Sequence, residues 1–172
     1  MYGIPHIATG DMIREMKDLP TDAGRELKVV YDRGDLVSDE LMIRLIHERL
    51  LRGDTVAGFV LDGYPRTMPQ AEALDELLRE LGRNLDVVFD FRVPDHEVLL
   101  QRMLRRAAEE GRSDDTPDAI RRRLELYETE TAPLVEYYRS TRGNVVGVHA
   151  DRSVEEVFHE IEESLSSVEA RA

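Results

Sequence analysis

The sequence predicts an α/β fold in which short strands alternate with longer helices. Three β-rich runs, at 58–62, 86–93 and 144–149, are separated by segments whose apolar residues recur with helical spacing. The chain has 172 residues, of which 41% are apolar, so we expect a single domain, 1–172, with a sizeable core. Open α/β sheets bind their ligands at the carboxyl ends of the strands. Functional residues are therefore expected where these runs end.

Helices are predicted ahead of the first clear strand. Residues 2–8 form a short mixed apolar segment, and Thr9 or Asp11 is suited to cap a helix that begins after them. A second helix is expected over 22–33, and Ser38 is suited to be the N-cap of a third. Three short helices thus precede the first strand.

The helices of the second half are predicted from prolines and capping residues. One is expected over 95–108, and another begins at Thr116 and continues to about Ser140, with an interruption or kink at Pro133. A capping box opens the last helix, which is expected to fray after Ser166. The residues of this box and of the inner apolar stripe are Ser153, Glu156, Val154, Val157, Ile161 and Leu165.

The most informative segment is 58–70, where an apolar strand ends in a carboxylate, a Gly/Pro turn and an arginine. A lone Asp-Gly pair usually marks a solvated turn. Here Asp62 follows a strand directly, and Thr67 and Gln70 have the spacing of a capping box that opens the next helix. The whole segment therefore indicates a strand that delivers Asp62 and Arg66 to a ligand-binding edge.

The charge distribution favours a small anionic ligand. A net charge of −13 argues against binding to nucleic acid or to a membrane surface, because a polyanion would be repelled. Arginines nevertheless crowd into one short stretch, which indicates a small polyanionic ligand or, alternatively, surface pairing with nearby acids. The arginines of this stretch are Arg102, Arg105, Arg106, Arg112, Arg121, Arg122 and Arg123.

Other classes are excluded by composition. The sequence has no apolar run long enough to cross a bilayer and no basic-then-apolar signal pattern near its start, so we expect a cytoplasmic protein. Cysteine is absent and the five histidines lack ligand spacing, so no zinc is expected.

The segment 58–70 resembles the signature of adenylate kinases, in the nucleoside monophosphate kinase family. This resemblance implies a P-loop NTPase-like three-layer α/β/α fold with a parallel sheet, and the reaction of ATP with AMP to give two ADP in a monomer. It also implies that Asp62 lies near Mg²⁺, held through water, and that Arg66 grips the AMP phosphate. Three further segments match the family in chain order.

The first of these segments, 7–14, resembles part of the AMP site. The resemblance implies that Thr9 lies near the adenine, that Arg14 contacts the phosphate and that Gln70 hydrogen-bonds the adenine edge. Pyrimidine-preferring relatives carry Ala in place of Thr9 and Asn in place of Thr67, so both residues favour AMP. The remaining AMP-binding residues that it implies are Asp35, Leu36, Val37, Gly63, Tyr64 and Pro65.

The other two segments resemble the ATP side. Arg102 and Arg106 share a helix face, and the resemblance places one beside the ATP adenine and the other on the phosphates. A short lid, 107–111, follows, of the type without a zinc-binding insertion. The resemblance further implies that Arg112 and Arg123 reach the transferring phosphoryl group and that Asp114 and Asp115 orient the lid. The backbone carbonyl of Arg152 is expected to hold the ATP adenine.

The family's phosphate loop, Gly-x-x-x-x-Gly-Lys-Ser/Thr, does not occur in the sequence. The resemblance begins at Met1, so we expect a central strand, the P-loop and a helix, roughly 30 residues, to be missing and the printed chain to be inactive alone. The expected parts are an AMP-binding helical subdomain, 9–38, and a core, 58–106 and 112–166. Two alternatives stay open: a non-catalytic AMP-binding protein, and a kinase for another nucleoside monophosphate.

Overall fold

The computed structural model describes residues 2–110 and 116–169, and its strands pair in parallel. β1 (His6–Ala8) pairs with β2 (Val60–Asp62), and Ala8 lies opposite Asp62. β3 (Val88–Arg92) pairs with β4 (Val145–His149), and Arg92 lies opposite His149. The predicted α/β architecture with parallel strands is confirmed.

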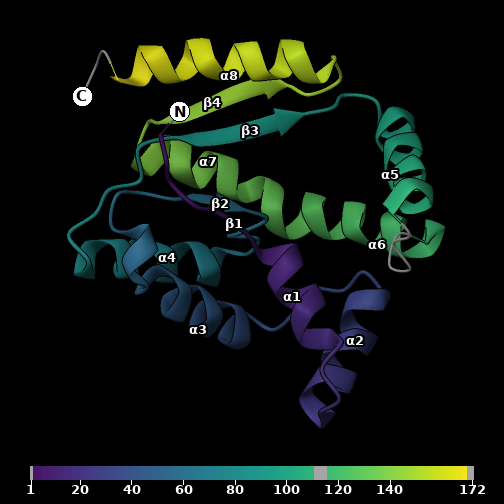
Figure 1. The fold of residues 1–172 in the computed structure, drawn as a ribbon. Coiled ribbons are helices and arrows are strands. Elements are labelled where there is room, and N and C mark those ends of the chain that lie inside the picture. The colour runs from purple at the N-terminus through teal and green to yellow at the C-terminus, as the bar shows by residue number, and fades with distance from the viewer. Residues whose placement is uncertain (1, 111–115, 170–172) are drawn as a thin grey trace.

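The strands do not form the single sheet that was expected. They form two two-stranded sheets, β1-β2 and β3-β4, and in the described part of the chain no strand joins β2 to β3 (Figure 1). β1 itself was not predicted, because three residues beside a proline give no clear strand pattern. The expectation that a central strand is missing stays a prediction.

Four helices accompany the first sheet: α1 (Thr9–Lys17), α2 (Asp22–Asp32), α3 (Asp39–Leu50) and α4 (Met68–Glu80). The helices α3 and α4 pack together, and α1 and α2 form a projecting pair at the bottom of the view (Figure 1). A short 3₁₀ turn, Gly53–Thr55, links α3 to β2.

Of the helix caps predicted at this end of the molecule, the one for the first helix is wrong. Helix α1 begins at Thr9 itself, and Ala8 is its N-cap without a side-chain bond, because the Thr9 hydroxyl is used elsewhere. Ser38 is the N-cap of α3 as predicted, although its side chain makes no capping hydrogen bond. Thr67 does cap α4, since its hydroxyl accepts from the backbone N–H of Gln70 at 3.4 Å.

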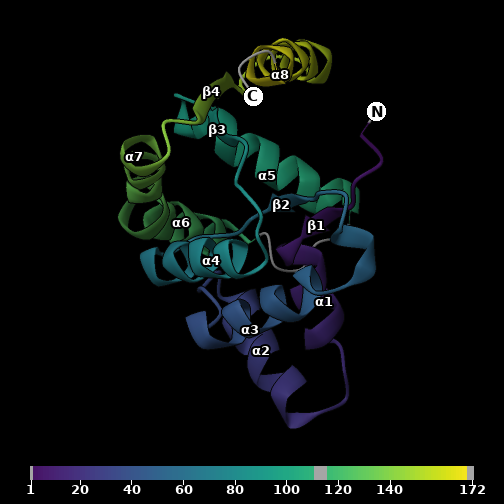
Figure 2. The same cartoon turned by 90° about the vertical axis from the view of Figure 1, so that its left-hand side faces the viewer.

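The second sheet is accompanied by α5 (His96–Glu110), α6 (Pro117–Leu126), α7 (Ala132–Thr141) and α8 (Val154–Glu169). Thr116 caps α6 as predicted, and the expected interruption ahead of Pro133 is a π-helical turn, Tyr127–Thr131. Figure 2, turned by 90°, shows α8 and the second sheet at the opposite end of the molecule from α1 and α2.

The last helix departs from its prediction in two ways. Ser153 and Glu156 form the expected capping box, with Ser153 N–H donating to Glu156 Oε2 at 3.0 Å. Val154 is 80% exposed, however, and so does not belong to the inner stripe, because it is the first residue of α8 and lies at the end of the helix. The helix also continues past Ser166 to Glu169.

The hydrophobic core is concentrated beneath the first sheet. Ile46, Leu50 and Leu78 are each 1% exposed and lie in one cluster contributed mainly by α1 to α4. A smaller cluster joins α4 to α7 through Ala71, Leu134 and Tyr138. No helix in the described ranges is long and apolar enough to cross a membrane.

Candidate active site

The turn that follows β2 is fixed by a buried threonine of α1. The Thr9 hydroxyl lies 3.1 Å from the carbonyl oxygen of Asp62 and 3.0 Å from that of Gly63, and it donates to this pair of acceptors. Thr9 is only 1% exposed. Gly63 has φ of +74°, and a Cβ there would lie 2.9 Å from the Thr9 hydroxyl, so glycine suits both the conformation and the space. Parallel pairing of β1 with β2 thus places Thr9 beside Asp62 and Gly63.

Arg66 is held within this turn by its backbone and by its side chain. Its Nε donates to the Gly63 carbonyl at 2.9 Å, and its backbone N–H donates to Gln70 Oε1 at 2.9 Å. Its carbonyl accepts from the Thr131 hydroxyl at 2.9 Å. Burial, together with the neighbouring positive charge of Arg123, lowers the pKa of the Arg66 guanidinium below its ordinary value. Such a partly desolvated cation is suited to an anionic partner.

Gln70 and Asp39 hold the turn in place through hydrogen bonds. Gln70 is 2% exposed, and its Nε2 donates to Asp39 Oδ1 at 2.7 Å, while the Thr67 hydroxyl donates to the same oxygen at 2.8 Å. The capping box is therefore incomplete, because the Gln70 side chain reaches the N–H of Arg66 and not that of Thr67. Sequence reasoning missed Asp39, whose place in the first turn of a helix predicts only a favourable charge.

Tyr64 and Pro65 complete the turn. The peptide bond between them is cis, and Tyr64 is buried with its hydroxyl donating to the Gln70 carbonyl at 3.2 Å. Burial raises the pKa of the Tyr64 hydroxyl above its ordinary value. A protonated phenol thus links the turn to the first residues of α4.

A second group of cations gathers around Tyr31 of α2. Arg14 Nη1 donates to the Tyr31 hydroxyl at 2.9 Å, and Arg14 also pairs with Asp11 in the same helix. The guanidinium of Arg123, from α6, lies 5.5 Å from the centre of the Tyr31 ring. Although burial opposes the charge of Arg14, its bonds to Tyr31 and Asp11 raise its pKa. Tyr31 was missed by sequence reasoning, in which it is one residue of a helical pattern.

The segment that follows α2 lies against α6. Gly34 has φ of +77°, and a Cβ there would come within 2.5 Å of the Ala119 carbonyl oxygen. The Asp35 carboxylate accepts from Arg122 Nε at 2.8 Å, Leu36 is half-buried and Val37 is buried in the core. This close approach brings the predicted AMP-side segment next to the helix that carries Arg123.

The residues predicted for the ATP side lie on the second sheet and its helices. Arg102 donates from Nη1 to the Ala150 carbonyl and from Nη2 to the Arg152 carbonyl, the latter at 3.3 Å. Arg106 is half-buried on the next turn of α5. Residues 107–110 form the end of α5, and their assignment to a short lid stays a prediction. Gly111, Arg112, Asp114 and Asp115 lie outside the described residues.

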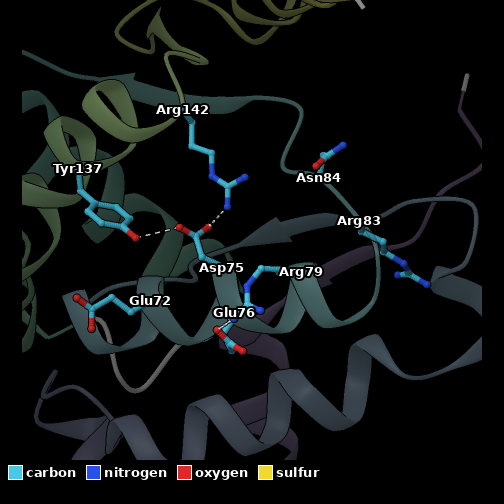
Figure 3. A pocket seen from close by; sticks show the side chains of 8 residues that line it. All are labelled: Glu72, Asp75, Glu76, Arg79, Arg83, Asn84, Tyr137 and Arg142. Carbon is cyan, nitrogen blue, oxygen red and sulfur yellow. Dashed lines mark hydrogen bonds and ion pairs between the residues drawn. The ribbon is translucent and has the colours of Figure 1, made fainter.

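A cavity of about 420 Å³ lies away from these residues, between α4, α7 and the segment that precedes β3 (Figure 3). Asp75 accepts from Arg142 Nη2 at 2.8 Å and from the Tyr137 hydroxyl at 2.9 Å, as the dashed lines in Figure 3 show. Several of the charged side chains that line this cavity are already paired with each other, so we assign no site to it. Its lining residues are Glu72, Asp75, Glu76, Arg79, Arg83, Asn84, Tyr137 and Arg142.

Comparison with known proteins shows the family to which the chain belongs. The family model described as adenylate kinase matches residues 1–143, which is most of the chain. The chain belongs to the adenylate kinase family. It is 44% identical over 164 residues to the adenylate kinase of Leptospira biflexa, an alignment that covers 95% of this chain and 87% of that protein.

Two further adenylate kinases are similarly close. That of Stenotrophomonas maltophilia is 46% identical over 147 residues, covering 84% of this chain and 78% of the relative. That of Xylella fastidiosa is 46% identical over 158 residues, covering 92% and 83%. Membership of a phosphotransferase family is thereby shown.

Adenylate kinases generally use Mg²⁺ with ATP, and the carboxylate at the end of β2 is a candidate ligand for this ion. Asp62 has a 64% exposed side chain, and its Oδ2 lies 3.1 Å from His6 Nε2. The described ranges contain no group of three or more His, Cys, Asp or Glu side chains that could hold a metal. A single accessible carboxylate fits Mg²⁺, which keeps several waters and binds substrate phosphates.

Proposed function

We propose that this chain binds AMP at the turn after β2 and takes part in reversible phosphoryl transfer, ATP + AMP to two ADP. The observation that carries the proposal is the buried network that fixes Arg66 beside Thr9 and Gln70, with Arg123 near it. A guanidinium that is held in place before the ligand arrives loses little freedom on binding. Its planar donors match phosphate oxygens.

The proposed chemistry asks the protein for position and charge. In the forward direction a phosphate oxygen of AMP attacks the γ-phosphorus of ATP, and the bond from that phosphorus to the β–γ bridging oxygen breaks. The transferring group carries its charge on oxygens, so arginines supply most of the stabilisation. We assign Arg14 and Arg66 to the AMP phosphate, and Arg106, Arg112 and Arg123 to the transferring group.

The base and the metal are assigned to neighbouring groups. The segment Asp35, Leu36 and Val37 and the side chain of Gln70 are proposed to line the adenine of AMP, although Gln70 must then exchange one of its present bonds. Asp62 would hold Mg²⁺ through water, and the ion when bound offsets phosphate charge. Thr9 holds the turn that positions both the base-binding residues and Asp62.

On the ATP side we propose that Arg102 and the Arg152 carbonyl contact the adenine. They lie together in this structure, since Arg102 donates to that carbonyl. The cradle for the ATP phosphates is not encoded in the sequence, because no lysine is followed by Ser or Thr in a glycine-rich loop. We therefore expect the 172-residue polypeptide by itself to bind AMP without efficient turnover.

The decisive experiment compares ADP formation by two polypeptides. One is the chain as printed, and the other is a chimera in which the strand, P-loop and helix of a relative precede Met1. We expect AMP binding by both and ADP formation by the chimera alone. Robust turnover by the 172-residue chain alone would show that the P-loop is dispensable. A chimera with no turnover would overturn the assigned reaction.

A second candidate is a non-catalytic AMP-binding protein, since Thr9, Arg66 and Gln70 are held together by hydrogen bonds within this chain. An inactive chimera that still binds AMP would support this candidate. Acceptor choice is tested in the same chimera by comparing AMP, CMP and UMP. Thr9 and Thr67 lead us to expect a preference for AMP, and a preference for CMP or UMP would contradict that assignment.

A further inference from the structure

We propose that Tyr31 is a positioning residue that holds Arg14 and Arg123 in place before the phosphate groups bind. The inference rests on the proposed function and deepens it. The Tyr31 hydroxyl accepts from Arg14 Nη1 at 2.9 Å, and its ring centre lies 5.5 Å from the Arg123 guanidinium. One side chain of α2 thus contacts cations of α1 and α6.

Lys17 adds a third cation to the same ring. Its side chain is only 8% exposed, which is unusual for lysine, and its ammonium lies 5.7 Å from the centre of the Tyr31 ring. Its ion pair with Asp18 is long, at 3.4 Å. The negative face of an aromatic ring attracts such cations. The ring therefore explains how a lysine is buried here beside two arginines.

An aromatic residue suits this place better than a carboxylate would. A carboxylate would also attract Arg14, Lys17 and Arg123, but it would cancel part of the positive charge that a phosphate needs. A neutral phenol contacts the cations without adding a further negative charge to those of Asp11 and Asp18. Fixing long side chains in advance also reduces the rotamer entropy that is lost on binding.

Two substitutions separate the contributions of the hydroxyl and the ring. Tyr31→Phe keeps the ring and removes the acceptor for Arg14, so we expect AMP affinity to fall about 5-fold. Tyr31→Leu removes both features, and we expect a fall of about 30-fold. Tyr137→Phe is the matched control on α7, where the hydroxyl contacts Asp75, and it should leave AMP affinity unchanged.

Adenosine distinguishes positioning of the phosphate site from general support of the subdomain. Isothermal titration of the 172-residue chain with AMP and with adenosine should show that the Tyr31 variants lose affinity for AMP and keep any affinity for adenosine. Equal losses for both ligands would overturn the proposal, and so would unchanged AMP affinity in Tyr31→Leu.

A readout that does not need AMP keeps this inference separate from the proposed function. Nitrogen-15 NMR of the arginine side chains reports how ordered the guanidinium groups are in the chain without ligand. We expect the Arg14 signal to become mobile in Tyr31→Phe, and the Arg123 signal to follow in Tyr31→Leu. If the chain binds no AMP, the proposed function fails, and this experiment still decides the role of Tyr31. Unchanged order of both groups would overturn it.

Discussion

The polar residues beside the two sheets differ in how deeply they are buried. At the end of β2, Thr9 and Gln70 are almost fully buried, and their side chains hold the turn that contains Arg66. At the end of β4, Arg102 and Arg152 are exposed, and Arg102 contacts backbone carbonyls at the surface. The polar side chains in the first half are thus fixed by buried hydrogen bonds, whereas those in the second half lie exposed at the surface.

The apolar residues show the same difference. The main core lies beneath β1 and β2, whereas Phe91 of β3 and Phe158 of α8 are 51% and 58% exposed. Deep packing is what holds charged side chains in defined positions. The comparison therefore teaches that the proposed AMP side is organised by packing within this chain, while the proposed ATP side has little packing to organise it.

The largest difference is expected in core stability. Leu78→Ala, in the first half, should lower the free energy of unfolding by about 3 kcal/mol, because it leaves a cavity at a side chain that is 1% exposed. Phe158→Ala, in the second half, should cost less than about 1 kcal/mol, since most of its side chain is already in water. Urea titrations compare the two, and equal losses would break the comparison.

The next effect is on AMP binding. Arg66→Ala removes a held guanidinium, and we expect AMP affinity to fall about 30-fold, as for the loss of a charge-assisted hydrogen bond. Arg139→Ala, on the exposed face of α7 where Arg139 pairs with Glu136, is the control and should have no effect. Isothermal titration measures both, and a loss of less than 3-fold for Arg66→Ala would contradict the assignment.

A comparable effect on stability is expected at Gln70, and a much smaller one at Gln101. Gln70→Ala should cost about 2 kcal/mol of unfolding free energy, because the N–H of Arg66 and the carboxylate of Asp39 lose their buried partner. Gln101→Ala should change stability by less than about 0.5 kcal/mol, since Gln101 is exposed and bonds only Glu97 among the contacts described. Similar losses of unfolding free energy in Gln70→Ala and Gln101→Ala would contradict the distinction between a buried and an exposed glutamine.

The smallest effect is a pH dependence in the second half. A hydrogen bond from His149 lowers the pKa of Glu160 below its ordinary value of 4.5, so the interaction stabilises the fold above that pH and is lost as the pH falls through the lowered pKa. The urea midpoints of the chain and of Glu160→Gln should therefore differ at pH 7 and approach each other as the pH falls through the lowered pKa of Glu160. A difference that stays constant as the pH is lowered would contradict this.

Much of the fold could be predicted because its signals are local. Pro133, the box of Ser153 and Glu156, and the strand that ends at Asp62 each act within a few residues. The division into two sheets could not be predicted, since pairing between strands depends on contacts that are distant in sequence. β1 was missed for the same reason, because only its pairing with β2 makes it a strand.

The candidate site was predicted as a set of residues but not as a network. The sequence indicated Asp62, Arg66 and Gln70 through one motif. It did not indicate Asp39 or Tyr31, whose roles depend on α3 and α2 folding back onto α4 and α6. The spacing of Arg14 and Lys17, one turn apart on α1, was the available signal for a shared anionic or aromatic partner.

The central claim is that the AMP side is formed by this chain alone. Isothermal titration of the 172-residue polypeptide with AMP, and separately with ATP, tests it most directly. The account predicts one AMP bound per chain and much weaker binding of ATP. A folded chain that gives no response to AMP, or that binds ATP as tightly as AMP, would contradict it.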